Sequence, residues 1–126
     1  GIIVPELHYG RDALIGIALV LSYLATSGKT LNDLRAGYAD YHMVKDKVQL
    51  SPELDVEAKL AAIKETYQDE ELNAVDGLKI DFAEGWVHLR RSNTEPIMRI
   101  YAESDSPEGA LALVERVKRE LVSGGN

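Results

Sequence analysis

The sequence predicts an α+β domain in which a four-stranded, mainly antiparallel sheet is covered on one face by two helices. Three observations support this prediction. Residues 78–103 contain short apolar and β-branched runs separated by polar turns. Residues 53–67 and 107–121 instead repeat apolar residues every three or four positions, as amphipathic helices do. Residues 1–40 differ from both, because an almost wholly apolar stretch lies at their centre.

The first part of the chain predicts a strand followed by a buried helix. Ile2–Pro5 has the composition of a strand end, because Pro5 lacks the N–H group that a sheet would use. Asp12 is a suitable N-cap for a helix over 13–26. The apolar residues of that stretch surround its circumference, so we expect a helix covered on several sides.

A short capped helix and a break complete this region. Thr30 is a suitable N-cap, and Asp33 stands where a capping-box partner is needed. Residues 37–40 then interrupt the pattern. We therefore predict two domains, 1–40 and 41–126, the first of them a strand-helix-helix remnant of an α/β domain.

The second region alternates strand and helix patterns in the order β-α-β-β-β-α. Residues that favour strands are concentrated in four runs. Acidic residues dominate 68–74, which we expect to be a loop, and a turn at Asp76-Gly77 follows. The four predicted strands are 41–50, 78–82, the run that contains Trp86, and 97–103.

Apolar spacing in the second region predicts two helices, each with one buried stripe. Ser106 and Pro107 suit the N-cap and first position of the later helix. Residues 123–126 are predicted to fray. The expected stripes are Val56, Leu60, Ile63 and Tyr67 in the earlier helix, and Leu111, Val114, Val117 and Leu121 in the later one.

The turn Arg90-Arg91-Ser92-Asn93-Thr94-Glu95-Pro96 carries the residues that indicate function. Arginine presents a planar fork of donors that matches phosphate oxygens, and turn hydroxyls with backbone N–H groups can line an anion-binding concavity. Asparagine tolerates the left-handed backbone that such turns often need. Arg99, in the returning strand, can face the same place, whereas strand alternation predicts that Arg91 faces away from Arg90. The alternative interpretation is an ordinary hairpin loop with solvated arginines.

Bulk properties exclude several classes of function. A net charge of −7 argues against sequence-independent nucleic-acid binding, although a local arginine cluster can still attract a small phosphorylated ligand. The chain has no cysteine, which excludes disulfides and thiolate metal sites. His8, His42 and His88 are too scattered for a metal-ligand spacing. The apolar run 13–25 is shorter than the roughly 20 residues of a membrane span. We expect a cytoplasmic protein that binds neither nucleic acid nor membranes.

The turn motif resembles a known phosphate-binding loop. Arg90-x-Ser92-Asn93-Thr94-Glu95-Pro96, followed by Met98-Arg99-Ile100-Tyr101, is similar to the loop of the α-D-phosphohexomutases. This family includes phosphoglucomutase, phosphomannomutase and phosphoglucosamine mutase. The resemblance extends to Val75–Ile80 and His8–Ala13, and so spans nearly the whole chain.

The resemblance implies both a fold and a place in a longer chain. Residues 41–126 are similar to the fourth, C-terminal domain of these enzymes, which has a TATA-binding-protein-like fold. Residues 1–40 then correspond to the end of the third domain. The chain begins at Gly1 in a strand-like run, which also predicts a piece of a longer protein.

The resemblance further implies an activity for the longer protein. Such enzymes interconvert the 1- and 6-phosphates of a hexose or hexosamine through an active-site phosphoserine, Mg²⁺ and a hexose bisphosphate activator. No matching catalytic or metal-binding residues occur in this sequence, so we expect the fragment alone to be inactive. Its implied partners are a phosphorylated sugar and the remaining domains of the parent chain. The implied phosphate-binding residues are Arg90, Ser92, Asn93 and Thr94, with Arg99 in support.

A different class of function stays open on sequence grounds. The chain could be a stand-alone anion-binding or interaction module. That alternative requires the apolar helix over 13–26 to be covered within this chain.

Overall fold

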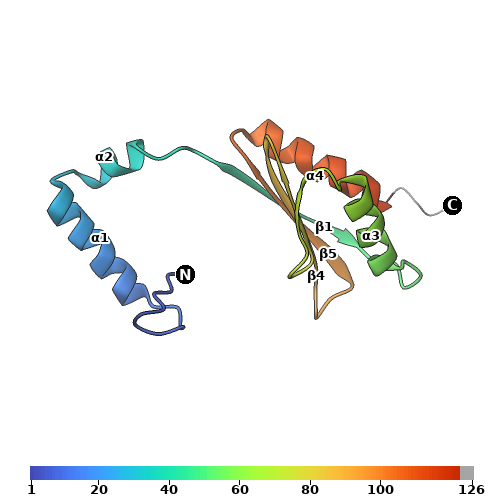
Figure 1. The fold of residues 1–126 in the computed structure, drawn as a ribbon, viewed down its shortest axis with the longest axis horizontal. Coiled ribbons are helices and arrows are strands. Elements are labelled where there is room, and N and C mark those ends of the chain that lie inside the picture. The colour runs from blue at the N-terminus through green and yellow to red at the C-terminus, as the bar shows by residue number, and fades with distance from the viewer. Residues whose placement is uncertain (123–126) are drawn as a thin grey trace. The chain divides into compact units, whose positions relative to one another are not determined.

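The structure, a computed structural model, describes residues 1–122 (Figure 1). The predicted fraying of residues 123–126 lies outside the described residues. The chain divides into two compact units, Gly1–Ala39 and Asp40–Asn126. Within residues 1–122, no helix combines the length and the apolar character that crossing a membrane requires.

The first unit contains two capped helices and no strand. Helix α1 (Ala13–Ser27) begins after Asp12, whose side chain accepts hydrogen bonds from two backbone N–H groups of the first turn. It ends at Gly28, whose φ of 65° is the left-handed conformation that a glycine cap adopts without strain. Helix α2 (Leu31–Ala36) begins with the predicted capping box of Thr30 and Asp33. These local caps account for both helices.

Two expectations for the first unit were wrong. Ile2–Pro5 forms no strand, and only an isolated bridge joins Val4 to His8. A strand needs a neighbouring strand to satisfy its N–H and C=O groups in a ladder. Here the Ile2 and Val4 carbonyl groups accept bonds from residues 7, 8 and 12, but no ladder forms. Helix α1 is not covered on several sides either, because none of its residues is buried.

The second unit is an antiparallel sheet of five strands in the order β1-β5-β4-β3-β2. The predicted four strands are all present, and β2 adds a fifth within residues expected to be an acidic loop. Three residues among carboxylates give no strand pattern of their own, so β2 depends on pairing with β3, where Leu72 lies opposite Ile80. The bounds are β1 His42–Gln49, β2 Glu71–Asn73, β3 Leu78–Phe82, β4 Gly85–Arg91 and β5 Ile97–Ser104.

Two helices of this unit pack on one face of the sheet, as predicted (Figure 1). Helix α3 (Val56–Thr66) begins at the N-cap Asp55, and helix α4 (Pro107–Val122) packs against β1, β4 and β5. The core between sheet and helices is formed by fully buried side chains, among them Ile80, Val87, Leu89, Met98, Ile100, Val114 and Val117.

The buried stripe of α4 differs from the predicted one at Leu111. Its side chain is 52% exposed, whereas Leu113 and Ala110 are buried with Val114, Val117 and Leu121. Successive residues turn by about 100° in a helix, so Leu111 lies a quarter-turn away from Ala110 and off the stripe. A sequence with leucine at both 111 and 113 does not show by spacing alone which of them faces the sheet.

Strand alternation sends a different set of side chains to the opposite, open face of the sheet. Leu78, Ile80 and Phe82 of β3 are buried as predicted. In β4, Val87 and Leu89 face the helices, so Trp86, His88 and Arg90 lie on the open face. The open face is therefore polar and aromatic, and no helix within residues 40–122 covers it.

Candidate functional site

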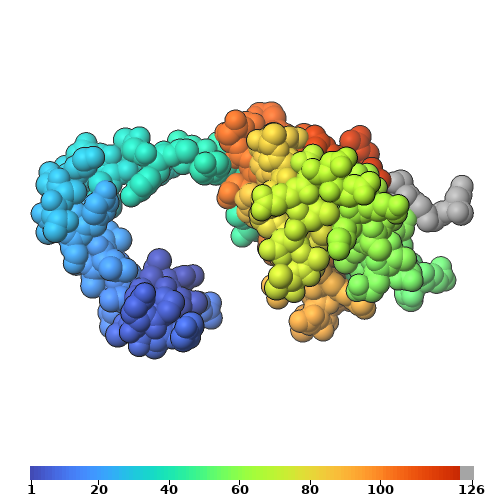
Figure 2. All heavy atoms as spheres, viewed as in Figure 1, coloured from blue at the N-terminus to red at the C-terminus, as the bar shows by residue number. Residues whose placement is uncertain are grey.

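The loop between β4 and β5 projects from one end of the second unit, where it is drawn in orange in Figure 2. Backbone hydrogen bonds close its base, with Ser92 N donating to Ile97 O at 3.0 Å and Ile97 N donating to Glu95 O at 2.8 Å. The Pro96 carbonyl accepts two further bonds from the end of β1, from Leu50 N at 2.8 Å and Gln49 Nε2 at 2.9 Å. The loop is thus bonded to two neighbouring strands.

A small hollow of about 200 Å³ lies at this loop. We call it the loop hollow. It brings together all five residues that the sequence motif indicated, because it is lined by Arg90, Arg91, Ser92, Asn93, Thr94 and Arg99. Pockets that enclose drug-sized ligands measure about 300–1,000 Å³, so the loop hollow fits one end of such a ligand.

Arg91 was predicted to face away from Arg90, and its position shows that it is nevertheless not remote from the loop hollow. It lines the loop hollow and also a second hollow beside the start of α3, together with Pro52 and Glu57. Alternation does direct its position in β4 toward the helix-covered face, but the strand ends at Arg91, and the turn brings that residue to the rim of both hollows. Arg91 is therefore a neighbour of the site rather than a residue remote from it.

Ser92 shapes the loop from within. Its side chain is only 9% exposed, and its Oγ accepts hydrogen bonds from Thr94 N at 3.4 Å and Glu95 N at 3.3 Å. A hydroxyl has one donor proton and two acceptor lone pairs, so one donor remains for Thr94 Oγ1, which lies 3.4 Å away, or for a ligand. Asn93 does not use the left-handed backbone that asparagine tolerates, since no described residue other than glycine has positive φ.

The two arginines of the motif have different carboxylate partners. Arg90 Nε lies 3.0 Å from Asp76 Oδ2, and Arg99 Nη2 lies 3.9 Å from Glu95 Oε2. Glu95 thus pairs loosely with Arg99. All four side chains are about half exposed, so these pairs orient the guanidinium groups more than they stabilise the fold.

The strand register places three cationic residues in one row across the sheet. Lys47 of β1 lies opposite Arg99 of β5, and Arg99 lies opposite Arg90 of β4. Like charges directly opposite one another destabilise a sheet. This row ends at the loop hollow, so the acidic chain carries a local concentration of positive charge at that place.

Sequence reasoning missed Asp76 as part of this arrangement. The signal was available, because a hairpin that pairs Phe82 with Gly85 brings Gly77 opposite Arg90. Gly77 has a φ of 75°, and a Cβ at this position would overlap the Leu89 carbonyl oxygen. The Asp76-Gly77 turn therefore lies directly against β4, where only glycine can fit.

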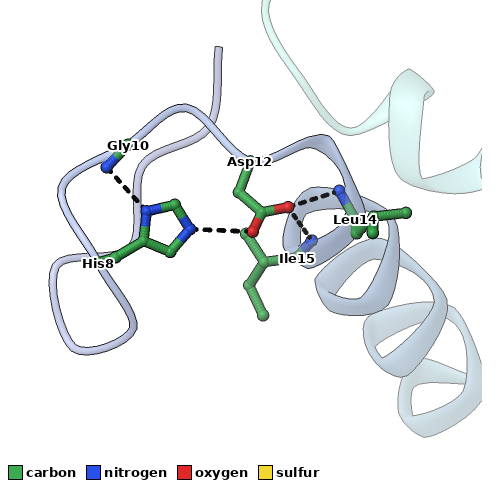
Figure 3. Close-up of polar contacts among 5 residues, drawn as sticks. All are labelled: His8, Gly10, Asp12, Leu14 and Ile15. Atoms are coloured by element: carbon green, nitrogen blue, oxygen red, sulfur yellow. Dashed lines mark hydrogen bonds and ion pairs between the residues drawn. The ribbon is translucent and has the colours of Figure 1, made fainter.

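His8 has structural partners. His8 Nε2 lies 3.0 Å from Asp12 Oδ2 and its Nδ1 accepts from Gly10 N at 2.9 Å, while Asp12 Oδ1 accepts from Leu14 N and Ile15 N (Figure 3). The hydrogen bond from His8, with those from the helix amides, holds the pKa of the Asp12 carboxyl below its usual range.

Metal binding has no support in the described part of the chain. Within residues 1–122, no group of three or more histidine, aspartate or glutamate side chains could hold a metal ion. The residues described here therefore do not fit the Mg²⁺ that the resemblance implies for the longer protein.

A larger hollow of about 680 Å³ belongs to the first unit and differs in character. Its lining is mainly apolar and includes Ile2, Ile17, Val20 and Leu21. It lies along α1, whose apolar side chains are not buried within this unit. Its lining lacks the convergent polar groups of a ligand site.

Comparison with known proteins identifies the family of the second unit. The family model described as phosphoglucomutase/phosphomannomutase, C-terminal domain, matches residues 44–120. That range contains the loop hollow and more than half of the chain. The chain belongs to the phosphoglucomutase/phosphomannomutase family.

Curated phosphohexomutases align with nearly the whole chain but are much longer. The phosphoglucosamine/phosphogalactosamine mutase of Sulfurisphaera tokodaii is 36% identical over 126 residues, which cover 98% of this chain and 28% of that protein. The phosphoglucomutase/phosphomannomutase of Thermococcus kodakarensis is 35% identical over 117 residues, covering 91% of this chain and 25% of that protein. The chain thus spans about a quarter of the length of these relatives.

Solved phosphohexomutase structures share the fold. Aspergillus fumigatus N-acetylphosphoglucosamine mutase in complex with glucose 1,6-bisphosphate matches with a TM-score of 0.56 at 24% identity, over 90% of this chain and 21% of that one. A phosphoglucomutase/phosphomannomutase family protein from Burkholderia thailandensis gives a TM-score of 0.53 at 22% identity, over 75% of this chain and 20% of that one. These matches confirm the predicted α+β class, with five strands in place of four.

Proposed function

We propose that the second unit holds the non-reacting phosphate of a phosphorylated hexose or hexosamine in a phosphohexomutase. One observation carries this proposal: the five residues of the loop motif, Arg90, Ser92, Asn93, Thr94 and Arg99, line a single hollow. In the longer protein, the other phosphate would be transferred to and from a phosphoserine, which interconverts the 1-phosphate and 6-phosphate of the sugar. In this proposal the chain binds the substrate phosphate, and phosphoryl transfer takes place in the rest of the longer protein.

Each residue has a distinct task in this proposal. Arg90 and Arg99 supply guanidinium forks that match phosphate oxygens and charge. Ser92 gives the loop its shape by accepting the Thr94 and Glu95 amides. The side chains of Asn93 and Thr94, which line the same hollow, donate to the remaining phosphate oxygens.

The contribution to catalysis is positional. Fixing one phosphate in place holds the other end of the sugar near the group that reacts with it, which replaces a bimolecular encounter with an oriented one. A hollow of about 200 Å³ accommodates a phosphate and leaves the sugar outside. Such a site can accept either end of a hexose bisphosphate, as a reaction that exchanges the two phosphates requires.

The remaining parts of the cycle are assigned to the longer protein. We propose that residues 1–40 correspond to the end of its third domain and residues 41–126 to its fourth. The hexose bisphosphate activator would be bound by the same loop hollow. Mg²⁺ would be held elsewhere, since the described residues provide no ligand set for it.

An NMR titration of the 126-residue chain with glucose 1,6-bisphosphate tests the proposal. We expect saturable amide shifts confined to residues 90–99, with sodium chloride at matched ionic strength as the control. Arg90→Ala should abolish the saturable shifts. Shifts that sodium chloride reproduces, or that spread over the whole sheet, would contradict phosphate binding at the loop hollow.

A kinetic comparison in the full-length enzyme tests the positional role. Arg90→Ala should lower kcat/KM by about 100-fold or more, because a misplaced substrate loses the oriented encounter. Arg91→Ala should have a smaller effect, since Arg91 is shared between the loop hollow and the hollow beside α3 and lies on the other face of β4 from Arg90. Equal losses in the two variants would refute the distinct role of Arg90.

A further inference from the structure

We propose that Asp76 is a positioning residue that directs the Arg90 guanidinium into the loop hollow. This inference rests on the proposed phosphate-binding function and names a residue that the loop motif does not contain. Asp76 lies in the turn between β2 and β3, and it does not line the loop hollow itself. It acts through Arg90.

The contact between the two side chains leaves the phosphate-binding donors of Arg90 free. Asp76 Oδ2 lies 3.0 Å from Nε of Arg90. A guanidinium has five N–H donors, of which Nε carries one and the two Nη atoms carry four. With Nε occupied, the plane of the group is fixed, and its Nη donors remain available to a phosphate at the loop hollow that Arg90 lines.

The turn that carries Asp76 is itself held against β4. Gly77 lies so close that a Cβ there would overlap the Leu89 carbonyl oxygen. His88 Nε2 lies 2.6 Å from the Asp76 carbonyl oxygen, a hydrogen bond that joins the turn to the strand. The Asp76 carboxylate is therefore presented from a backbone that is fixed at two points, as a positioning group requires.

Electrostatics favours the same role. Arg90 lies directly opposite Arg99 in the sheet, so the two guanidinium groups repel one another at short range. Asp76 offsets that repulsion for Arg90 without occupying the loop hollow. The two side chains are 52% and 61% exposed, so the pair contributes little to folding and its removal should leave the unit folded.

The test compares Asp76→Ala and Asp76→Asn in the 126-residue chain. The first readout is the Nε–Hε NMR signal of Arg90 without ligand, which reports directly on the proposed contact. The second is the affinity for inorganic phosphate, followed by the amide shifts of residues 90–99. We expect Asp76→Ala to lose the distinct Arg90 signal and to weaken phosphate binding by about 3- to 10-fold. Asp76→Asn, whose amide oxygen still accepts a hydrogen bond, should retain part of both.

A matched control is available at the far end of the same sheet. Glu84 Oε1 lies 2.9 Å from Arg116 Nη2 in an exposed carboxylate–arginine pair of similar burial. Glu84→Ala removes such a pair away from the loop hollow. We expect it to change neither the Arg90 signal nor the phosphate affinity.

The outcomes separate this inference from the function on which it rests. If wild-type chain binds phosphate and Asp76→Ala binds it equally well with an unchanged Arg90 signal, the positioning role is wrong and the proposed function stands. If wild-type chain shows no phosphate-dependent shifts at residues 90–99, phosphate binding by this chain is contradicted. In that case the Arg90 signal still decides the contact, and its persistence in Asp76→Ala would overturn the inference.

Discussion

The helices α1 and α4 have similar lengths and opposite relationships to their surroundings. Helix α4 buries Ala110, Leu113, Val114, Val117 and Leu121 against the sheet, whereas α1 buries none of its 15 residues. Yet α1 is the more apolar of the two. The difference shows that capping residues suffice to define where a helix begins and ends, while its stability depends on the apolar surface that packs against it.

Separating the two units should give the largest effect. Residues 40–126 contain a complete core, so we expect that fragment to unfold cooperatively and to retain its phosphate affinity. Residues 1–39 alone should be mostly unfolded, because isolated helices of about 12–15 residues are marginal in water. Circular dichroism of the two fragments measures this, and stable helix in 1–39 alone would remove the contrast between the units.

Truncating one apolar side chain should destabilise the second unit by several kcal/mol more than the first. Ile80→Ala removes a side chain with no exposed surface, and we expect a loss of about 2–5 kcal/mol in the free energy of unfolding. Leu14 is 78% exposed, so Leu14→Ala should change the free energy of unfolding of the first unit by no more than about 0.5 kcal/mol. Urea denaturation followed by tryptophan fluorescence of Trp86 reports on the second unit. Helix signals in NMR spectra follow the first.

The cationic row in the second unit should show a conflict between stability and binding. Replacing Lys47 by Gln removes a charge directly opposite Arg99, so we expect the unit to gain about 0.2–1 kcal/mol of stability. The same change should weaken phosphate binding at low salt. Lys45→Gln is the matched control, because Lys45 lies two residues away on the same strand and face, with its Nζ 5.7 Å from the centroid of the Tyr101 ring. Equal effects of the two variants on binding would indicate a general charge effect rather than a role for the row.

Acidification should weaken the N-cap of α1 by protonating Asp12. We expect this effect to be the smallest of the four. The hydrogen bond from His8 and those from Ile15 and Leu14 lower the pKa of Asp12 from its usual 3.8. A lowered pKa in the folded state means that the stabilisation is complete above pH 3.8 and is lost as the pH falls through the lowered value. NMR shifts of Leu14 and Ile15 should therefore titrate with a midpoint below 3.8. Asp12→Asn keeps a good N-cap, and in that variant this transition should disappear.

Local patterns account for most of the fold that the sequence allowed us to predict. The capping box at Thr30, the alternation at Leu78–Phe82 and the proline start of α4 each depend on a few neighbouring residues, and the structure confirms all three. Strand β2 and the isolated position of Ile2–Pro5 depend on whether a partner strand is present. Nearest-neighbour chemistry does not contain that information.

The candidate site shows the same division. The motif indicated which residues gather, because four of the five lie within residues 90–94 and Arg99 lies in the strand that returns from the loop. It did not show that Ser92 accepts two loop amides, or that Asp76 lies beside Arg90. The second point follows from the hairpin register, which was available once the turn at Glu84-Gly85 was placed. Alternation gave the face of Arg91 in β4 but not its place at the loop hollow, because Arg91 is the last residue of the strand and adjoins the turn.

The pairing of β1 with β5 has a consequence for the order in which the second unit forms. Strands β2 to β5 follow one another in the chain and pair as local hairpins, whereas β1 pairs with the last strand of the sheet. Contacts between distant segments form slowly, because a long loop must close first. The bonds from Leu50 and Gln49 to Pro96 therefore close last. During synthesis, the loop would remain open at one side until β5 has emerged and β1 has joined it.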